Sequence, residues 1–372
     1  MASGPPPRLI VKVGSSLLVD ASGAVRREWL AELVADIAAR VAGGQQIAIV
    51  SSGAIALGAR RLGLGKGGRA SLEDAQAAAA VGQIALAGVW AELLGAQGLT
   101  AAQMLVTLDD LEDRRRYLNA SATLDRLMSL GVVPVINEND SVATQEIRFG
   151  DNDRLAARIA QVAGAQTVVL LSDVDGLHTA DPATDPAARR IARVTRIDAR
   201  IEAIAGSGST SGMGSGGMAS KVAAARIATA SGVDLVIVSG HEAHPLARVD
   251  AGAGTRFVGD GKARSKKSWL AGRLTVRGTI EVDAGAASAL AGGASLLPAG
   301  ARAVEGRFAR GDVVDILGPL GVAIARGLSE YDSVDAARIA GQKSDAVAVT
   351  LGHAPRSALV HRDHMVLLGG KP

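Results

Sequence analysis

Short apolar runs rich in valine and isoleucine recur along residues 1–240 and alternate with amphipathic helical segments. Such alternation is typical of an α/β fold in which helices cover both faces of a mainly parallel open sheet. The segment 25–41 predicts one of these helices, because its leucines and Ile37 share one stripe and Gly43-Gly44 ends it. The runs that predict strands are 8–13, 46–51, 132–136, 167–171 and 234–238.

The composition narrows the class of protein. With 372 residues, 48% of them hydrophobic, the chain can bury a large core and is expected to form two domains. The absence of cysteine excludes disulfides, zinc–thiolate sites and cysteine nucleophiles. A net charge of +3 does not by itself call for nucleic acid. The first seven residues have no apolar signal-peptide core, which predicts a cytoplasmic protein.

One uncharged stretch, residues 75–91, is a candidate for a membrane span. It is rich in alanine and is interrupted by Gln76, Gly82 and Gln83, so it matches a span poorly at the lower limit of length. We therefore expect a buried helix here and no membrane association.

The character of the sequence changes after residue 259. A basic, poorly periodic connection follows, with Lys262, Arg264, Lys266, Lys267, Arg273 and Arg277. From residue 278 onward the segments are short and strand-like, with turns at 298–300, 309–312 and 318–319. The predicted organisation is a first domain over 1–260, a basic linker over 261–277, a small mainly β domain over 278–356 and a C-terminal tail over 357–372.

A glycine-rich loop precedes a helical stretch in the first domain. Six glycines and four serines fill residues 206–217, and Met218-Ala219-Ser220-Lys221 opens the helix. Glycine lets backbone N–H groups approach oxygen ligands closely, the helix N-terminus adds partial positive charge, and the lysine adds a full one. The loop therefore favours a phosphate cradle, although a flexible surface loop explains an isolated Gly/Ser tract equally well.

Two common nucleotide-binding motifs do not account for this loop. Residues 212–217 have the spacing G-x-G-x-x-G, but a dinucleotide site requires a strand directly before the first glycine, and residues 201–211 predict a helix end and a loop. A Walker A motif requires Gly-Lys-Ser or Gly-Lys-Thr, whereas three residues separate Gly217 from Lys221. Both classes are therefore disfavoured.

Polar residues follow nearly every predicted strand. Lys12 stands at the carboxyl end of the first strand, where burial on both faces leaves its ammonium no water except beyond the sheet edge. The other segments are Ser51-Ser52-Gly53-Ala54, Asn137-Glu138-Asn139-Asp140, Gly150-Asp151-Asn152-Asp153 and Ser172-Asp173. A role as helix N-cap explains Asp151 or Asn152, but it does not explain all three polar residues of 151–153. This sheet edge has the composition expected for a phosphorylated nucleotide beside an amine-bearing substrate.

These segments resemble the glutamate 5-kinases of the amino acid kinase family. The resemblance rests on residues 12–16, 51–55, 134–140, 150–153 and 214–221, and residues 278–352 resemble a PUA domain. It implies the amino acid kinase fold and the ATP-dependent phosphorylation of L-glutamate, the first step of proline biosynthesis. It also implies Mg²⁺ with the ATP, feedback inhibition by proline and a homo-oligomer, either a dimer or a tetramer.

The resemblance further implies roles for individual residues. Ser52, Gly53, Asp140 and Asn152 would bind glutamate, with nearby backbone N–H groups on its carboxylates. ATP would contact Lys12, Ser172, Asp173, Ser215, Gly216, Gly217, Met218, Ala219, Ser220 and Lys221. Lys12 and Lys221 would neutralise the transferring phosphoryl group, and Asp153 would orient both lysines. No residue is assigned to a metal.

Two alternatives stay open at this stage. Kinases of the same fold that act on N-acetylglutamate, aspartate, carbamate or uridylate share the phosphate chemistry. Asp140 distinguishes L-glutamate from N-acetylglutamate, because an N-acetylated substrate has no ammonium group to pair with its carboxylate. The PUA-like segment and the basic linker favour RNA as a partner, although only 2% of the residues are aromatic and few could stack on bases.

Overall fold

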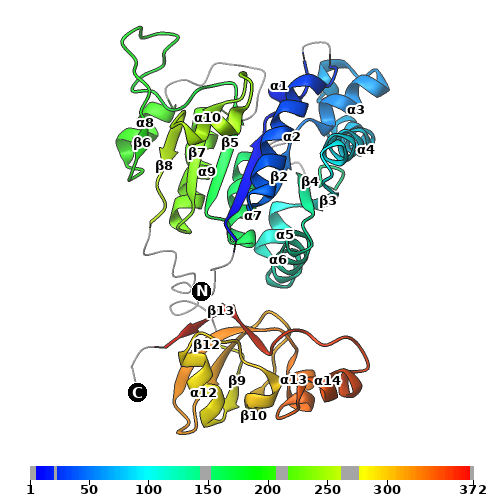
Figure 1. The fold of residues 1–372 in the computed structure, drawn as a ribbon, viewed down its shortest axis with the longest axis vertical. Helices are drawn as coiled ribbons and strands as arrows, with labels where there is room; N and C mark the ends of the chain where they lie inside the picture. Colours follow the sequence, from blue (N-terminus) through cyan, green and yellow to red (C-terminus); the bar gives the residue numbers. More distant parts are fainter. Residues whose placement is uncertain (1–5, 21–22, 143–151, 207–216, 261–275, 369–372) are drawn as a thin grey trace. The chain divides into compact units, whose positions relative to one another are not determined.

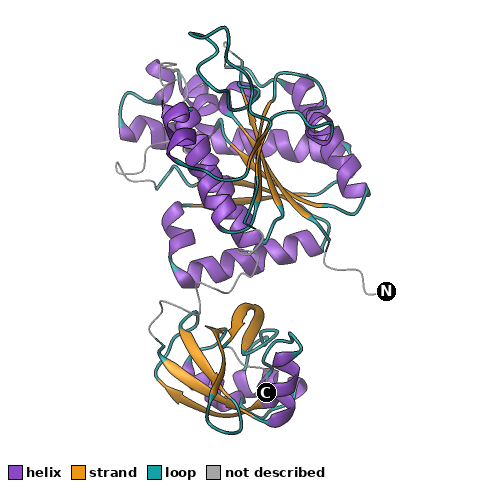
Figure 2. Ribbon diagram, turned by 90° about the vertical axis from the view of Figure 1, so that its left-hand side faces the viewer, coloured by secondary structure: helices purple, strands orange, loops and turns teal. Residues whose placement is uncertain are grey.

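The computed structural model describes residues 6–20, 23–142, 152–206, 217–260 and 276–368. The chain divides into two compact units, residues 1–264 and 265–372. The first unit is a sheet between layers of helices, and the second is a smaller sheet with its own helices (Figure 1, Figure 2).

Eight strands of the described residues form the sheet of the first unit, in the order β3-β4-β2-β1-β5-β7-β8-β6. Neighbours from β3 to β7 are parallel, and β8 is antiparallel to β7. β1 lies between β2 and β5, so the strands that follow it in sequence are added first on one side of β1 and then, from β5 onward, on the other. Ligands of open α/β sheets bind near the point where the strand order reverses in this way. The bounds are β1 (Arg8–Val13), β2 (Gln46–Ser51), β3 (Ala101–Val106), β4 (Val133–Glu138), β5 (Thr167–Ser172), β6 (Arg193–Val194), β7 (Asp234–Ser239) and β8 (Thr255–Phe257).

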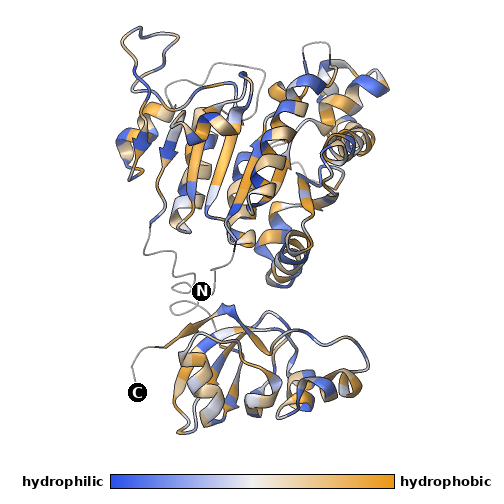
Figure 3. Ribbon diagram, in the orientation of Figure 1, coloured by the Kyte–Doolittle hydropathy of each residue, from blue (hydrophilic) through white to orange (hydrophobic). Residues whose placement is uncertain are grey.

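Helices cover both faces of this sheet, whose central strands are strongly hydrophobic (Figure 2, Figure 3). Val11 and Val13 pack in the core beneath α2, α4 and α10, whereas Ile10 packs in the core beneath α6, α7 and α9. Side chains alternate along a strand, so Lys12 lies on the face of Ile10. The bounds are α1 (Ser15–Leu18), α2 (Arg27–Ala42), α3 (Ala54–Leu62), α4 (Leu72–Ala96), α5 (Leu108–Glu112), α6 (Arg114–Ser129), α7 (Asn152–Ala163), α8 (Ala199–Gly206), α9 (Met218–Ala230) and α10 (Pro245–Asp250).

The predicted strands are confirmed as β1, β2, β4, β5 and β7, and the predicted helix as α2. The other strands of the first unit, β3, β6 and β8, are not anticipated by the sequence. β3 is an edge strand whose side chains are mostly half-buried or exposed, so no continuous apolar run marks it. β6 and β8 have only two and three residues, too few to leave a periodic signal.

Helix α4 contains the uncharged stretch that was considered as a membrane span. Among the described residues, it is the helix long and apolar enough to cross a membrane. Of its most apolar window, 44% is buried inside the protein, and Trp90 and Leu94 are fully covered. The helix is therefore only partly buried, with one side packed in the core and residues such as Ile84 exposed.

Helices α3 and α4 cross at a contact made of small residues. A Cβ atom on Gly82 would lie 1.8 Å from the carbonyl oxygen of Ala54, and a Cβ atom on Gly58 would lie 1.7 Å from that of Ala78. Both obstacles are backbone atoms, which cannot move aside as the end of a flexible side chain could. Only glycine permits the two helices to approach this closely.

We expect Gly82→Ala to lower the free energy of unfolding by about 2 kcal/mol, because the added methyl group overpacks the crossing. Gly88, on the same helix, has no atom within 4 Å of its Cβ position, so Gly88→Ala is the matched control. That control should be neutral or stabilise by up to about 1 kcal/mol, the gain in helix propensity. Urea unfolding followed by circular dichroism measures both, and equal stabilities would contradict the close crossing.

The second unit is built on its own sheet. Five strands of the described residues form it in the order β10-β9-β11-β12-β13, with β9 and β11 parallel and the other neighbours antiparallel. Ile280, Ile316 and Ala325 lie in its core, which confirms the small mainly β domain. The bounds are β9 (Gly278–Val282), β10 (Ala301–Gly306), β11 (Val313–Leu317), β12 (Ala323–Ser329), β13 (Val360–Leu367), α12 (Ala284–Ala291), α13 (Ser333–Ile339) and α14 (Ser344–Leu351).

This unit extends beyond its predicted end at residue 356. β13 pairs with β12, and its Val360 and Met365 are buried in the core, so the predicted C-terminal tail over 357–372 is wrong. The polar run 361–364 lies in the middle of β13, and such a run is typical of a solvated tail, so the sequence does not indicate the strand. Most of the predicted basic linker, residues 261–275, lies outside the described residues.

Candidate functional site

Two lysines from distant parts of the chain meet at one carboxylate. Lys12 Nζ lies 2.6 Å from Asp153 Oδ1, and Lys221 Nζ lies 3.2 Å from Asp153 Oδ2. The relative exposures are 8% for Lys12, 2% for Asp153 and 5% for Lys221. The structure therefore brings together the three residues to which the resemblance assigns catalytic roles.

The topology of the first unit produces this meeting. Lys12 lies on the face of the sheet that α7 and α9 cover, near the carboxyl end of β1. Helices that lead into parallel strands run antiparallel to them and begin at the carboxyl edge of the sheet. Asp153 is the second residue of α7 and Lys221 is the fourth residue of α9, so both stand at that edge.

The charges of the cluster do not cancel. Burial raises the pKa of the Asp153 carboxyl, but the charges of Lys12 and Lys221 and their hydrogen bonds outweigh burial and hold this pKa below its ordinary value. The carboxylate is thus ionised at neutral pH. One negative charge between two positive charges leaves an excess of positive charge, which suits an anionic ligand.

The N-terminus of α9 adds backbone donors to this positive region. Gly217 is the N-cap and has no side chain to cap the helix, so the N–H groups of Met218 and Ala219 have no acceptor within the helix, whereas those of Ser220 and Lys221 donate to the carbonyl oxygen of Gly217. Such a helix start is well suited to bind an anion. The predicted cradle residues Ser215 and Gly216 lie outside the described residues, as does the remainder of 207–216.

Ser52 and Asn152 are in contact at the end of β2 and the start of α7. Asn152 Nδ2 donates to Ser52 Oγ at 2.7 Å and to Asn137 Oδ1 at 3.2 Å. Asn152 is 4% exposed, and its Oδ1 is buried without a hydrogen-bond partner among the described residues. Because Ser52 Oγ accepts from Asn152, its own hydroxyl proton is left to donate. The pair therefore offers one donor and one acceptor.

Asp140 lies just beyond the end of β4 and is 8% exposed. Burial raises the pKa of its carboxyl to about 6, although the charge of Arg69 acts in the opposite direction. A cation in contact with this carboxylate would replace the lost hydration and lower the pKa again. Asp140 is therefore suited to bind a cationic group.

The backbone near Ser52 shows which N–H groups are available to a ligand. The N–H of Ser52 donates to the carbonyl oxygen of Val13 at 3.1 Å, so it is used within the fold and does not face a ligand. Gly53 follows with a φ of 102° and is the N-cap of α3, a conformation that favours glycine. The open backbone donors at this place belong to the first turn of α3.

Ser172 and Asp173 lie at the carboxyl end of β5, the neighbour of β1. Leu171 pairs with Val13, so Ser172 stands one residue beyond the paired part of β1. Ser172 Oγ donates to Asp173 Oδ1 at 2.9 Å, and Asp173 is exposed. Both predicted nucleotide contacts are thus at the same edge of the sheet as Lys12.

Helix α4 contributes two side chains that the sequence does not mark as part of the site. Gln83 Oε1 accepts from Asn137 Nδ2 at 2.8 Å, and Trp90 Nε1 donates to Ser51 Oγ at 2.9 Å. The signal for Gln83 is its place as a polar residue within the uncharged, alanine-rich stretch of this helix. Nothing in the sequence indicates the bond of Trp90, which is a fully buried aromatic side chain.

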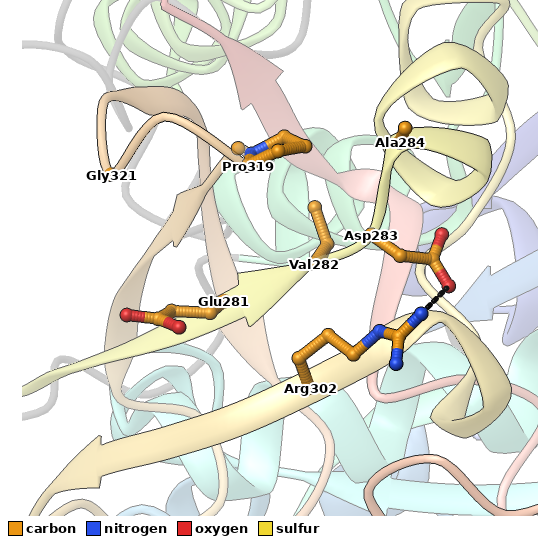
Figure 4. A pocket seen from close by; sticks show the side chains of 8 residues that line it. Glu281, Val282, Asp283, Ala284, Arg302, Pro319 and Gly321 are labelled. Atoms are coloured by element: carbon orange, nitrogen blue, oxygen red, sulfur yellow. Dashed lines mark ion pairs between the residues drawn. The ribbon is translucent and has the colours of Figure 1, made fainter.

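A separate hollow of about 390 Å³ lies in the second unit (Figure 4). Its charged side chains are Glu281, Asp283 and Arg302. Arg302 points to Asp283 with 3.7 Å between Nη2 and Oδ2, and Asp283 also caps α12 by accepting from the N–H of Ala286. These contacts within the unit account for Asp283 and Arg302, and the predicted site residues lie in the first unit.

We expect Asp153→Asn to destabilise the protein by about 3 kcal/mol at neutral pH, since it leaves two buried ammonium groups without their counterion. A carboxyl whose pKa is lowered by folding stabilises the fold above its ordinary value of 3.8, and this contribution is lost as the pH falls through the folded value. The advantage of the wild type should therefore persist at neutral pH and vanish in acid.

Thermal and urea unfolding at several pH values measure this difference. The control is Asp250→Asn, which removes an ion pair with Arg40 whose carboxylate is 67% exposed. That variant should change the stability by less than about 1 kcal/mol. A similarly small effect for both variants would contradict the structural role of Asp153.

Comparison with known proteins agrees with these observations. Residues 7–239 match the model of the amino acid kinase family, and residues 278–351 match that of the PUA domain. The chain is 68% identical to glutamate 5-kinase of Sphingopyxis alaskensis over 97% of this chain and 98% of that protein. It is 64% identical to glutamate 5-kinase of Zymomonas mobilis over 97% of this chain and 91% of that protein.

A solved structure of carbamate kinase from Giardia lamblia aligns with a TM-score of 0.49 and 16% identity, over 68% of this chain and 99% of that one. The assignment rests on the sequence matches, which extend over both units. The chain belongs to the amino acid kinase family, within the group of the glutamate 5-kinases, and carries a PUA domain after its kinase domain.

Proposed function

We propose that this protein transfers the γ-phosphoryl group of ATP to the side-chain carboxylate of L-glutamate and gives L-glutamyl 5-phosphate and ADP. The observation that carries the proposal is the pair of buried lysines on Asp153, with the buried amide acceptor of Asn152 on the preceding residue and the buried Asp140 carboxylate beyond the end of β4. The relatives at 68% and 64% identity bear the name glutamate 5-kinase. This reaction would be the first step of proline biosynthesis.

The chemistry requires neutralisation of charge rather than a general base. The side-chain carboxyl of glutamate has an ordinary pKa near ~4.3 and is already ionised at neutral pH. Its oxygen attacks the γ-phosphorus, the bond from this phosphorus to the β,γ-bridging oxygen breaks, and ADP leaves. Lys12 and Lys221 reduce the repulsion between the two anions and stabilise the charge on the transferring group.

Mg²⁺ enters this proposal with the nucleotide. The described residues contain no group of three or more His, Asp or Glu side chains that could hold a metal ion. Mg²⁺ commonly keeps several waters and binds the phosphates of its nucleotide. We therefore treat it as part of the ATP substrate, and the residues at the end of β5 and the start of α9 as the contacts of that nucleotide.

The second half of the site suits the amino acid end of glutamate. Asp140 and Asn152 Oδ1 are acceptors for an α-ammonium group, and the hydroxyl of Ser52 is a donor for a carboxylate. N-acetylglutamate has no ammonium and would leave the buried Asp140 unpaired. Carbamate and uridylate lack it too, and aspartate is one methylene shorter, so these acceptors are disfavoured.

Two further features accompany the proposal and are supported by the resemblance alone, namely feedback inhibition by proline and assembly into a homo-oligomer. We also propose a cytoplasmic location. The RNA partner suggested by the PUA domain remains a hypothesis, because the basic linker that motivates it lies mainly outside the described residues.

The proposed acceptor is tested by trapping the acyl phosphate with hydroxylamine. We expect hydroxamate formation with L-glutamate and at least about a hundredfold less with N-acetylglutamate, the discrimination that an unpaired buried polar group can give. Lys221→Ala serves as the control for enzyme-dependent signal, since loss of one transition-state donor lowers kcat by roughly a hundredfold or more. Equal rates with N-acetylglutamate would contradict the proposal.

A second test uses the pH dependence of kcat/KM for glutamate at saturating MgATP. Asp140 must be ionised to receive the ammonium, and its pKa is raised to about 6 by burial. The kcat/KM for glutamate should therefore be constant at higher pH and fall about tenfold per pH unit below the pKa of Asp140. Asp140→Asn should be much less active and lack this inflection, and an inflection retained in the variant would assign it to another group.

A further inference from the structure

Three amide side chains form a hydrogen-bonded chain whose direction is fixed at one point by the backbone. The N–H of Glu138 donates to Asn137 Oδ1 at 2.9 Å. A backbone N–H can only donate, so this atom of Asn137 must be the oxygen. The amide nitrogen of Asn137 then faces the other way, toward α4.

The orientations of the two amide side chains that contact Asn137 follow from this constraint. Asn137 Nδ2 donates to Gln83 Oε1 at 2.8 Å, so Gln83 must present its oxygen. Asn137 Oδ1 also accepts from Asn152 Nδ2 at 3.2 Å, so Asn152 must present its nitrogen to this chain. The remaining atom, Asn152 Oδ1, is the buried acceptor without a partner among the described residues.

We propose that Gln83 is a positioning residue for the amino acid substrate, acting through Asn137 on Asn152. Gln83 holds the amide of Asn137, and Asn137 in turn holds Asn152 with its oxygen, not its nitrogen, toward the ligand. The inference rests on the proposed function and adds a residue on α4 that lies two hydrogen bonds from Asn152.

The orientation of the Asn152 side chain matters because one end of its amide accepts hydrogen bonds and the other donates them. Its oxygen accepts from an ammonium group, whereas its NH₂ group would repel one. Without an acceptor at position 83, the Nδ2 of Asn137, a residue that is only 2% exposed, loses its partner, and this loss favours a rotation of the Asn137 side chain. Asn152 then keeps its bonds to Ser52 Oγ at 2.7 Å and to the carbonyl oxygen of Ser51 at 3.4 Å but loses the bond to Asn137, so its oxygen is held less firmly in the orientation that binds the substrate.

This chain of amides does not include the lysine pair. Lys12 and Lys221 contact Asp153 and no member of the chain in the described contacts. A loss at position 83 should therefore weaken the binding of glutamate and leave the binding of ATP nearly unchanged. A residue that merely supports the fold would change both.

The test compares two replacements of Gln83 in the full-length enzyme. Gln83→Met keeps the length of the side chain but removes the acceptor, and Gln83→Glu keeps an acceptor oxygen for Asn137. We expect the KM for glutamate to rise about tenfold in Gln83→Met and to stay within about threefold of the wild type in Gln83→Glu. The KM for ATP should stay within about twofold in both.

The matched control is Ile84→Met, which places the same new residue next in the same helix at a position that is 75% exposed. It should leave both KM values unchanged. Gln83→Ala replaces Gln83→Met if the methionine variant does not fold, as judged by circular dichroism and thermal unfolding.

The outcomes separate this inference from the proposed function. A wild type that forms no glutamyl phosphate overturns the function itself. An active wild type whose KM for glutamate is unchanged in Gln83→Met, or is raised equally in Gln83→Glu, overturns the role of Gln83 alone. Equal increases of the KM values for glutamate and ATP also overturn it, because they indicate a general disturbance of the site.

Discussion

A single buried carboxylate between two buried ammonium groups is the interaction on which the kinase domain depends. Asp153 touches Lys12 and Lys221 inside the protein, where any one of these charges alone would be costly. Their meeting requires the alternation of β1 to place Lys12 on the correct face and requires α7 and α9 to begin at the same edge of the sheet. The parallel topology satisfies both requirements at once.

Helix α7 joins the two halves of the site through consecutive residues. Asn152 belongs to the chain of amides that ends at Ser52, whereas Asp153 belongs to the lysine pair. One half carries excess positive charge for phosphates, and the other offers neutral and anionic acceptors for an amine. Because Asn152 and Asp153 are consecutive residues in the first turn of one helix, the backbone fixes the distance between the two halves of the site.

Much of this arrangement can be predicted from the sequence, but not all of it. The parallel strands are buried on both faces, so continuous apolar runs mark them, and the polar residues behind each run locate the site. β3 and β13 lack this signal because one is an edge strand and the other carries a polar run in its middle. Gln83 was visible as a polar interruption of α4, yet its partner Asn137 is distant in sequence. Only the packing of α4 reveals their bond.

Helix α4 carries a close helix crossing and a bond to the chain of amides on adjacent residues. Gly82 allows the close crossing with α3, and the next residue, Gln83, accepts a hydrogen bond from Asn137. Trp90 donates to Ser51, the residue before Ser52. Natural variation along this helix is therefore restricted from two sides. A larger residue at position 82 that pushed α4 away from α3 would also move Gln83, so the crossing and the bond to Asn137 are coupled through the backbone of the helix.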